Sequence, residues 1–197
     1  MAGRVGHFGL AGALLALAVA ATPAAAQDKP RYGGELIFAV PSEMPSYDGH
    51  REGTFGMVHP LAPHYNTLLR TDPNDRSGTK IVADVAESWT ISSDGRVYTL
   101  KLRRGVKFHD GSEMTSKDVK ASYDKIVFPP PNVGSQRKGQ YTNVEAIEAP
   151  DASTIVFRLK WPQASFLTSL ASPYNWIYKA DILAKDIRWY ETNVMGT

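Results

Sequence analysis

The sequence has 197 residues, a formal net charge of +2 at pH 7 and no cysteine. Without cysteine there are no disulfide bonds, no thiolate metal ligands, no cysteine nucleophile and no cysteine to carry a lipid anchor. The near-neutral charge gives no electrostatic reason to expect nucleic acid or an anionic membrane as a partner.

The first 26 residues have the pattern of a secretory signal peptide. Arg4 precedes an apolar run over residues 8–21, and small residues at 24–26 lead to Gln27. The run is shorter than the about 20 apolar residues that a membrane-spanning helix needs, although an uncleaved anchor is the alternative. We therefore expect cleavage before Gln27 and a mature protein located in the periplasm.

Residues 35–40 form an apolar run bounded by glycine and proline, which predicts a buried strand. A turn-rich loop over residues 41–48 follows it and carries Glu43 and Tyr47. Open α/β sheets bind ligands at the carboxyl ends of their strands, so this loop is a candidate binding element.

The segment 56–69 is apolar but contains Pro60 and Pro63. Because proline is tolerated in the first turn of a helix, the sequence predicts a helix that begins near these prolines and runs to about Leu69. A polar surface turn is expected over residues 71–78.

Residues 86–122 carry consistent local signals. Asp94-Gly95 predicts a hairpin turn between two strands. Thr115 and Asp118 have the spacing of a capping box at the start of a helix. Met114 and Val119 occupy the positions of a hydrophobic staple around the same cap.

The second half of the chain predicts another hairpin, formed by residues 144–148 and 154–160, after an exposed loop over residues 129–139. A helix is expected from Phe166, a short strand over residues 175–178 and a brief helix over residues 181–185.

The stretch 86–122 resembles the signature of the extracellular solute-binding proteins of family 5, which are receptors of ABC importers for peptides, nickel and related solutes. The matching positions are Ala86, Asp94, Leu102-Arg103, Arg104-Gly105-Val106-Lys107-Phe108, His109-Asp110-Gly111, Thr115, Asp118-Val119 and Ser122.

The resemblance implies an α/β fold of the periplasmic-binding-protein class II type. Residues 27–46 and 161–197 would belong to a main lobe, and residues 47–160 would form an inserted β-rich subdomain of sheet and helix. Family members have a second lobe that these residues do not supply. The chain is therefore interpreted as an N-terminal fragment with the second lobe missing.

The resemblance also implies a non-enzymatic receptor without a cofactor. It would capture a solute, with a peptide as the default, and deliver it as a monomer to ABC permease subunits with their cytoplasmic ATPase. A nickel or other-solute receptor and a sensor for signalling are the alternatives. A secreted hydrolase is disfavoured because no serine stands in a nucleophile elbow with a positioned histidine and acid.

The candidate ligand-binding residues are Glu43, Tyr47, Tyr174, Asn175 and Trp176. Aromatic and amide side chains supply the apolar walls and orienting polar groups of a solute site, and a carboxylate can meet an amino group. The alternatives are that Glu43 is a solvated loop carboxylate, and that Tyr174 and Trp176 are core residues.

The histidines at 50, 59 and 64 are spaced nine and five residues apart, which places no two of them at the i, i+4 step of a helical metal site. No metal site is therefore expected. His109-Asp110 precedes a glycine and is interpreted as a turn, and no catalytic residue is expected.

Overall fold

The computed structural model describes residues 32–35, 37–40 and 42–197. The chain divides into two compact units, residues 1–37 and 38–197. In the first unit, residues 32–35 and 37 are exposed and have no regular secondary structure. The predicted signal peptide and its cleavage site lie outside the described residues. In the part of the chain that the structure describes, no helix has both the length and the apolar character needed to cross a membrane.

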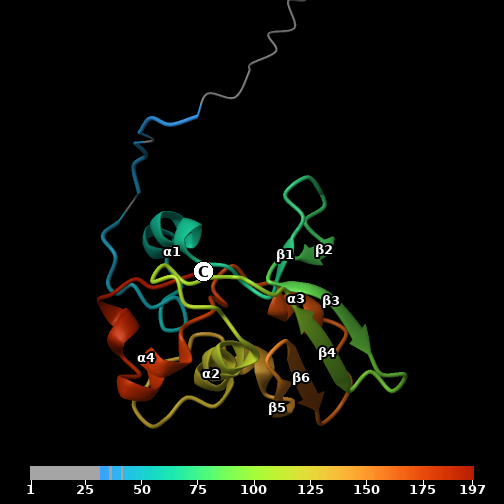
Figure 1. Ribbon diagram of the computed structural model, residues 1–197. Helices are drawn as coiled ribbons and strands as arrows, with labels where there is room; N and C mark the ends of the chain where they lie inside the picture. The colour runs from blue at the N-terminus through green and yellow to red at the C-terminus, as the bar shows by residue number, and fades with distance from the viewer. Residues whose placement is uncertain (1–31, 36, 41) are drawn as a thin grey trace, which may run out of the picture. The chain divides into compact units, whose positions relative to one another are not determined.

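The second unit is built around a four-stranded antiparallel sheet with the strand order β3-β4-β6-β5 (Figure 1). Its strands are β3 (Ala86–Ile91), β4 (Val97–Leu102), β5 (Val144–Asp151) and β6 (Thr154–Leu159). The predicted turn joins β3 to β4, and Gly95 within it has a φ of 70°, which glycine adopts at no steric cost. Both predicted hairpins are confirmed, and the pairing of β4 with β6 joins them into one sheet.

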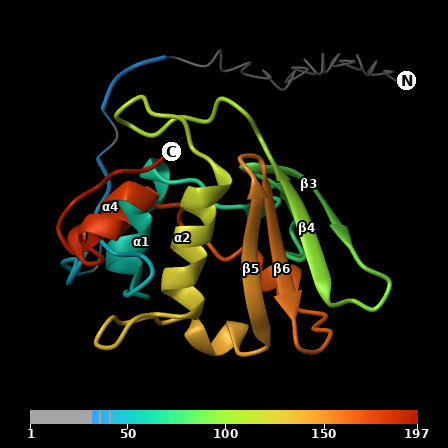
Figure 2. The same ribbon diagram turned by 60° about the horizontal axis from the view of Figure 1, so that its bottom comes forward.

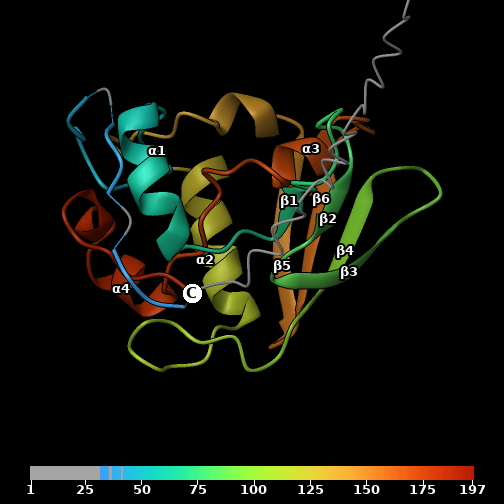
Figure 3. The same cartoon turned by 90° about the horizontal axis from the view of Figure 1, so that it is seen from above.

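Helix α2 (Ser116–Val127) lies between the sheet and the helices α1 (Phe55–Leu61) and α4 (Ala180–Lys185), as Figures 2 and 3 show. The predicted cap is present, because the Thr115 backbone N–H donates to Asp118 Oδ2 at 2.8 Å. Val119, Tyr123 and Ile126 are fully buried and form the apolar stripe of α2 that packs against the sheet.

A second apolar cluster lies on the other side of α2 from the sheet. Its buried members are Met57, Val58, Leu61, Tyr65, Trp176, Tyr178, Leu183 and Tyr190. They come from α1 and its C-terminal flank and from the last part of the chain, so the cluster joins segments that are far apart in sequence. The predicted domain boundaries near residues 47 and 161 remain a prediction.

The predicted buried strand over residues 35–40 is wrong. The described residues of this run have no strand structure, and Ile37 and Phe38 are 84% and 51% exposed. A strand needs a neighbour to bond its backbone N–H and C=O groups. Among the described residues, no strand pairs with this run.

The predicted helix near the two prolines is also wrong in its position. Helix α1 begins at Phe55, and Pro60 lies inside it near its end. Burial of Met57, Val58 and Leu61 favours the earlier start, and Pro60 removes one hydrogen bond. The chain then makes a 3-10 turn (Ala62–His64) before β1 (Leu69–Thr71), which pairs with β2 (Ile81–Ala83).

The predicted strand over residues 175–178 is absent. The segment is buried, but among the described residues no strand pairs with it. The predicted helices are confirmed as α3 (Phe166–Leu170) and α4. Two further 3-10 helices span Lys138–Tyr141 and Trp189–Glu191.

Candidate functional site

Two segments that carry predicted binding residues are in contact, through residues of the first segment that follow the predicted loop 41–48. We call residues 42–53 the first loop and residues 172–178 the second loop. The Tyr174 hydroxyl of the second loop donates to the Gly53 carbonyl at 3.1 Å, and the Gly49 N–H of the first loop donates to the Tyr178 hydroxyl at 2.9 Å. The indole of Trp176 covers Gly49 so closely that a Cβ there would lie 2.5 Å from its ring. The two loops therefore pack as one structural element.

Glu43 and Tyr47 lie on the accessible side of the first loop. Glu43 is exposed and Tyr47 is half-buried, and both line a shallow depression together with Val40, Ser42 and Met44. The Glu43 carboxylate forms no hydrogen bond or ion pair with any described residue. The Tyr47 backbone N–H donates to the Glu191 carbonyl at 3.0 Å, which anchors the loop. Both side chains are therefore accessible to a solute.

Tyr174 is half-buried on the second loop. The Arg137 guanidinium lies 3.8 Å from the centre of its ring, and Arg137 Nη1 also donates to the Glu52 carbonyl at 2.9 Å. One face of Tyr174 is thus occupied by a cation that is itself tied to the first loop.

Asn175 and Trp176 have the surroundings of core residues. Asn175 is fully buried, and its Nδ2 donates to the Tyr141 hydroxyl and the Ser169 carbonyl, both at 2.8 Å. Trp176 is 1% exposed and stacks on Tyr65 with the ring centres 4.4 Å apart. Trp176 also contributes to the wall of a cavity of about 350 Å³. Their role in binding a solute remains a prediction.

A buried ion pair lies beneath the loops, and no sequence motif marks it. The Lys125 ammonium of α2 pairs with Asp48 Oδ2 of the first loop, and the two side chains are 1% and 2% exposed. Asp48 Oδ1 accepts the His50 backbone N–H and the Tyr178 hydroxyl, each at 3.0 Å. Lys125 lies among apolar positions on the inner side of α2, but the sequence around it does not show which acid it meets.

The environment of this pair shifts several pKa values. Burial raises the pKa of Asp48, but the Lys125 ammonium and the hydrogen bonds that the carboxylate accepts lower it by more. Burial, reinforced by the Lys125 charge, lowers the pKa of His50 to about 3. Burial also lowers the pKa of Lys125, and the Asp48 carboxylate opposes that shift. At neutral pH the site holds the Asp48 carboxylate paired with Lys125 beside an uncharged His50 imidazole.

The three clustered histidines of the sequence are separated in the structure. His50 is fully buried and its Nε2 bonds the Trp176 carbonyl at 2.9 Å, whereas His59 and His64 are exposed. Within the described ranges, no group of three or more His, Cys, Asp or Glu side chains is arranged to hold a metal ion.

His109 and Asp110 lie in the turn before Gly111 and bond two different later segments of the chain. The His109 N–H donates to the Gly196 carbonyl at 2.9 Å, and Asp110 pairs with Lys179. The two residues thus serve different partners, in keeping with a turn.

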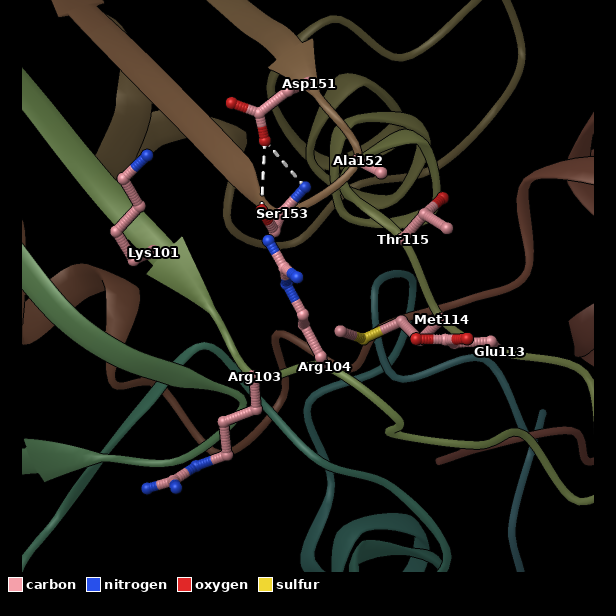
Figure 4. Close-up of a pocket in the computed structure, with 9 residues that line it drawn as sticks. All are labelled: Lys101, Arg103, Arg104, Glu113, Met114, Thr115, Asp151, Ala152 and Ser153. Carbon is pink, nitrogen blue, oxygen red and sulfur yellow. Dashed lines mark hydrogen bonds between the residues drawn. The ribbon is translucent and has the colours of Figure 1, made fainter.

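A separate cavity of about 530 Å³ lies beside the turn between β5 and β6 (Figure 4). Arg104 points toward Ser153 in this view, and Lys101 adds positive charge to the lining. The Arg103 guanidinium points away from Ser153 and donates to the Asp84 carbonyl at 2.7 Å. Glu113 and Asp151 supply negative charge, and Asp151 accepts the Ser153 N–H at 2.8 Å. The mixed charge gives this cavity no clear preference for an anion or a cation.

Comparison with solved structures places this geometry in a known class. The chain is similar to AgaA from A. tumefaciens R10 in complex with agropinic acid, with a TM-score of 0.69, 31% identity and coverage of 79% of this chain and 30% of AgaA. It is also similar to DppA from Helicobacter pylori in complex with the peptide STSA, with a TM-score of 0.63, 30% identity and coverage of 74% and 31%. The fold is therefore that of a periplasmic binding protein, of which the chain contains a part.

The sequence comparisons define the family. Residues 80–197 match the description "Bacterial extracellular solute-binding proteins, family 5 Middle". The chain belongs to this family. It is 31% identical over 179 residues to the glutathione-binding protein GsiB of Salmonella choleraesuis. The matched region covers 91% of this chain and 33% of GsiB. The chain thus spans about a third of the length of this curated relative.

Proposed function

We propose that the protein is a periplasmic receptor of an ABC importer that captures a peptide-like solute and presents it to a membrane permease driven by a cytoplasmic ATPase. The observation that carries the proposal is membership of family 5 together with relatives that bind glutathione or the peptide STSA. Glutathione is itself a small peptide with amino and carboxylate groups, so both relatives handle the same solute chemistry.

The accessible side chains of the two loops suit such a solute. We propose that the exposed Glu43 carboxylate meets a solute amino group and that Tyr47 and Tyr174 contact its body. Asn175 and Trp176 would form the wall behind Tyr174. Capture would be completed by closure of a second lobe, because a solute shifts the equilibrium only if it binds the closed state better.

A nickel complex is the second candidate solute. The chain is 25% identical to NikZ from Campylobacter jejuni, solved with Ni(L-His), with a TM-score of 0.66 and coverage of 79% of this chain and 30% of NikZ. A receptor that binds a preformed metal complex needs side chains that contact the complex, and it does not need a full set of protein ligands for the metal. A sensor that signals without transport is the third candidate, which a transport assay separates from the first two.

The proposal is tested with the gene product isolated from its source cell. Native mass spectrometry should show a peptide-like molecule that leaves on mild denaturation, and deletion of the gene should lower uptake of that molecule. Glu43→Gln should weaken binding of the molecule, whereas Glu145→Gln, which changes an exposed carboxylate on β5, should not. A nickel complex in place of the peptide would favour the second candidate. Normal uptake after deletion would contradict the importer role.

Export is tested separately by N-terminal sequencing. We propose that the periplasmic protein begins at Gln27. Protein from the periplasmic fraction that still begins at Met1 would contradict signal-peptide cleavage.

A further inference from the structure

We propose that the buried pair of Asp48 and Lys125 is a positioning device that fixes the first and second loops in one mutual arrangement. This rests on the proposed function only in treating those loops as the solute-contacting elements. The pair itself does not reach the surface, since its side chains are 1% and 2% exposed. Asp48 and Lys125 are therefore positioning residues and do not contact the solute.

Asp48 connects three segments of the chain. It belongs to the first loop, it accepts the hydroxyl of Tyr178 from the second loop at 3.0 Å, and it pairs with Lys125 from α2. Its Oδ1 also accepts the His50 N–H at 3.0 Å, which bends the first loop around the carboxylate. Loss of this one carboxylate would remove the bonds to all three segments.

His50 and Ser122 add bonds in the same place. His50 Nε2 donates to the Trp176 carbonyl at 2.9 Å, and the His50 ring stacks on Tyr178 with a centre-to-centre distance of 4.2 Å. Ser122 Oγ of α2 accepts the Tyr178 N–H at 2.7 Å. Helix α2 thus holds the second loop directly through Ser122 and the first loop through Lys125.

Stability alone does not account for a charge pair at this depth. Removing both ions from water is costly, and hydrophobic replacements of buried ion pairs often keep or increase stability. What an ion pair adds is direction, because a carboxylate with several donors is satisfied in one arrangement only, whereas apolar contacts tolerate sliding. The loops that this carboxylate orders are the ones that carry Glu43, Tyr47 and Tyr174.

The test measures backbone hydrogen exchange of the gene product by mass spectrometry, without any solute. Three variants are compared with the parent: Lys125→Met, the double variant Asp48→Asn with Lys125→Met, and Lys120→Met. Lys120 is the matched control, because it lies on the same helix and pairs with Asp124 at 2.7 Å, but its side chain is 40% exposed. Urea unfolding gives the stability of each variant.

Lys125→Met should lower stability, because it leaves the Asp48 carboxylate buried without its cation. The double variant should recover much of that stability, since neither charge remains. In both, exchange in the first and second loops should rise about tenfold or more while β4 and β6 stay protected. Lys120→Met should leave both loops unchanged.

Loops that exchange at the parent rate in the double variant would overturn the proposal. An equal rise in the exchange rates of the loops and of β4 and β6 would also overturn it, because the pair would then serve global stability. Failure of the double variant to fold would overturn it for the same reason. Since no solute is present, these results are independent of the proposed function. Absence of any captured solute from a protein with correctly ordered loops would contradict the proposed function alone.

Discussion

The rings of Tyr65 and Trp176 lie parallel, with centres 4.4 Å apart and planes inclined by 5°. Tyr65 follows the 3-10 turn after α1, and Trp176 belongs to the second loop. The stack therefore fastens the second loop to the helical part of the chain. It also covers one face of the indole, in keeping with the 1% exposure of Trp176.

Trp176→Ala should lower the free energy of unfolding by about 3–5 kcal/mol, because it leaves a large cavity between Tyr65 and Gly49. Trp176→Phe should cost less, since it keeps a ring on Tyr65. Urea unfolding followed by circular dichroism measures both. A loss below about 1 kcal/mol for the alanine variant would show that this side chain is not a core residue.

Gly49→Ala should destabilise the protein by about 1–3 kcal/mol through overpacking. The added Cβ would lie 2.5 Å from Trp176 Cε3, and the indole is also held by its stack on Tyr65. Gly139→Ala is the control, because a Cβ there meets nothing within 4 Å. Thermal unfolding of the two variants should separate them; equal melting temperatures would mean that the indole moves aside freely.

Stability should fall as the pH is lowered below about 6.5 because of His50. The pKa of its imidazole is about 3 in the folded protein, against an ordinary value of 6.5, so between these values the unfolded chain binds a proton that the folded protein does not. The free energy of unfolding then decreases by up to about 1.4 kcal/mol per pH unit. Asp48, whose pKa is lowered by folding, adds a further loss only at more acidic pH.

His50→Gln should reduce the stability difference between pH 7 and pH 5 by about 2 kcal/mol, since the variant has no imidazole to protonate. His59→Gln, at an exposed position of α1, should leave that difference unchanged. Urea unfolding at the two pH values is the measurement. If His50→Gln shows the same stability difference between pH 7 and pH 5 as the parent, the pKa of His50 in the folded parent lies near its ordinary value.

Asp118→Ala should cost about 2–3 kcal/mol, more than an ordinary helix cap. The carboxylate accepts the Thr115 N–H through Oδ2 and the Ala180 N–H through Oδ1, both at 2.8 Å, so it caps α2 and also holds the start of α4. Asp124→Ala on the same helix removes only a half-exposed ion pair and should change stability by less than about 0.5 kcal/mol. Comparable losses of unfolding free energy in the two variants would mean that Asp118 contributes little to stability beyond a local helix cap.

Elements with local causes could be predicted from the sequence. The Asp94-Gly95 turn, the Thr115–Asp118 cap and the two hairpins depend on residues close together in the chain, and the first hairpin and the cap lie in the stretch that identified the family. The same local logic failed for the apolar run 35–40, because a strand exists only beside a partner strand, which its own residues cannot supply.

The burial of charged and aromatic groups depends on contacts between distant parts of the chain. The Asp48–Lys125 pair joins residues 77 positions apart, and the His50–Trp176 bond joins residues 126 positions apart. The sequence could name Asn175 and Trp176 as candidates, but their burial follows from what the folded chain brings around them. The two loops were visible as separate segments in the sequence, and their joint packing on α2 became visible only in three dimensions.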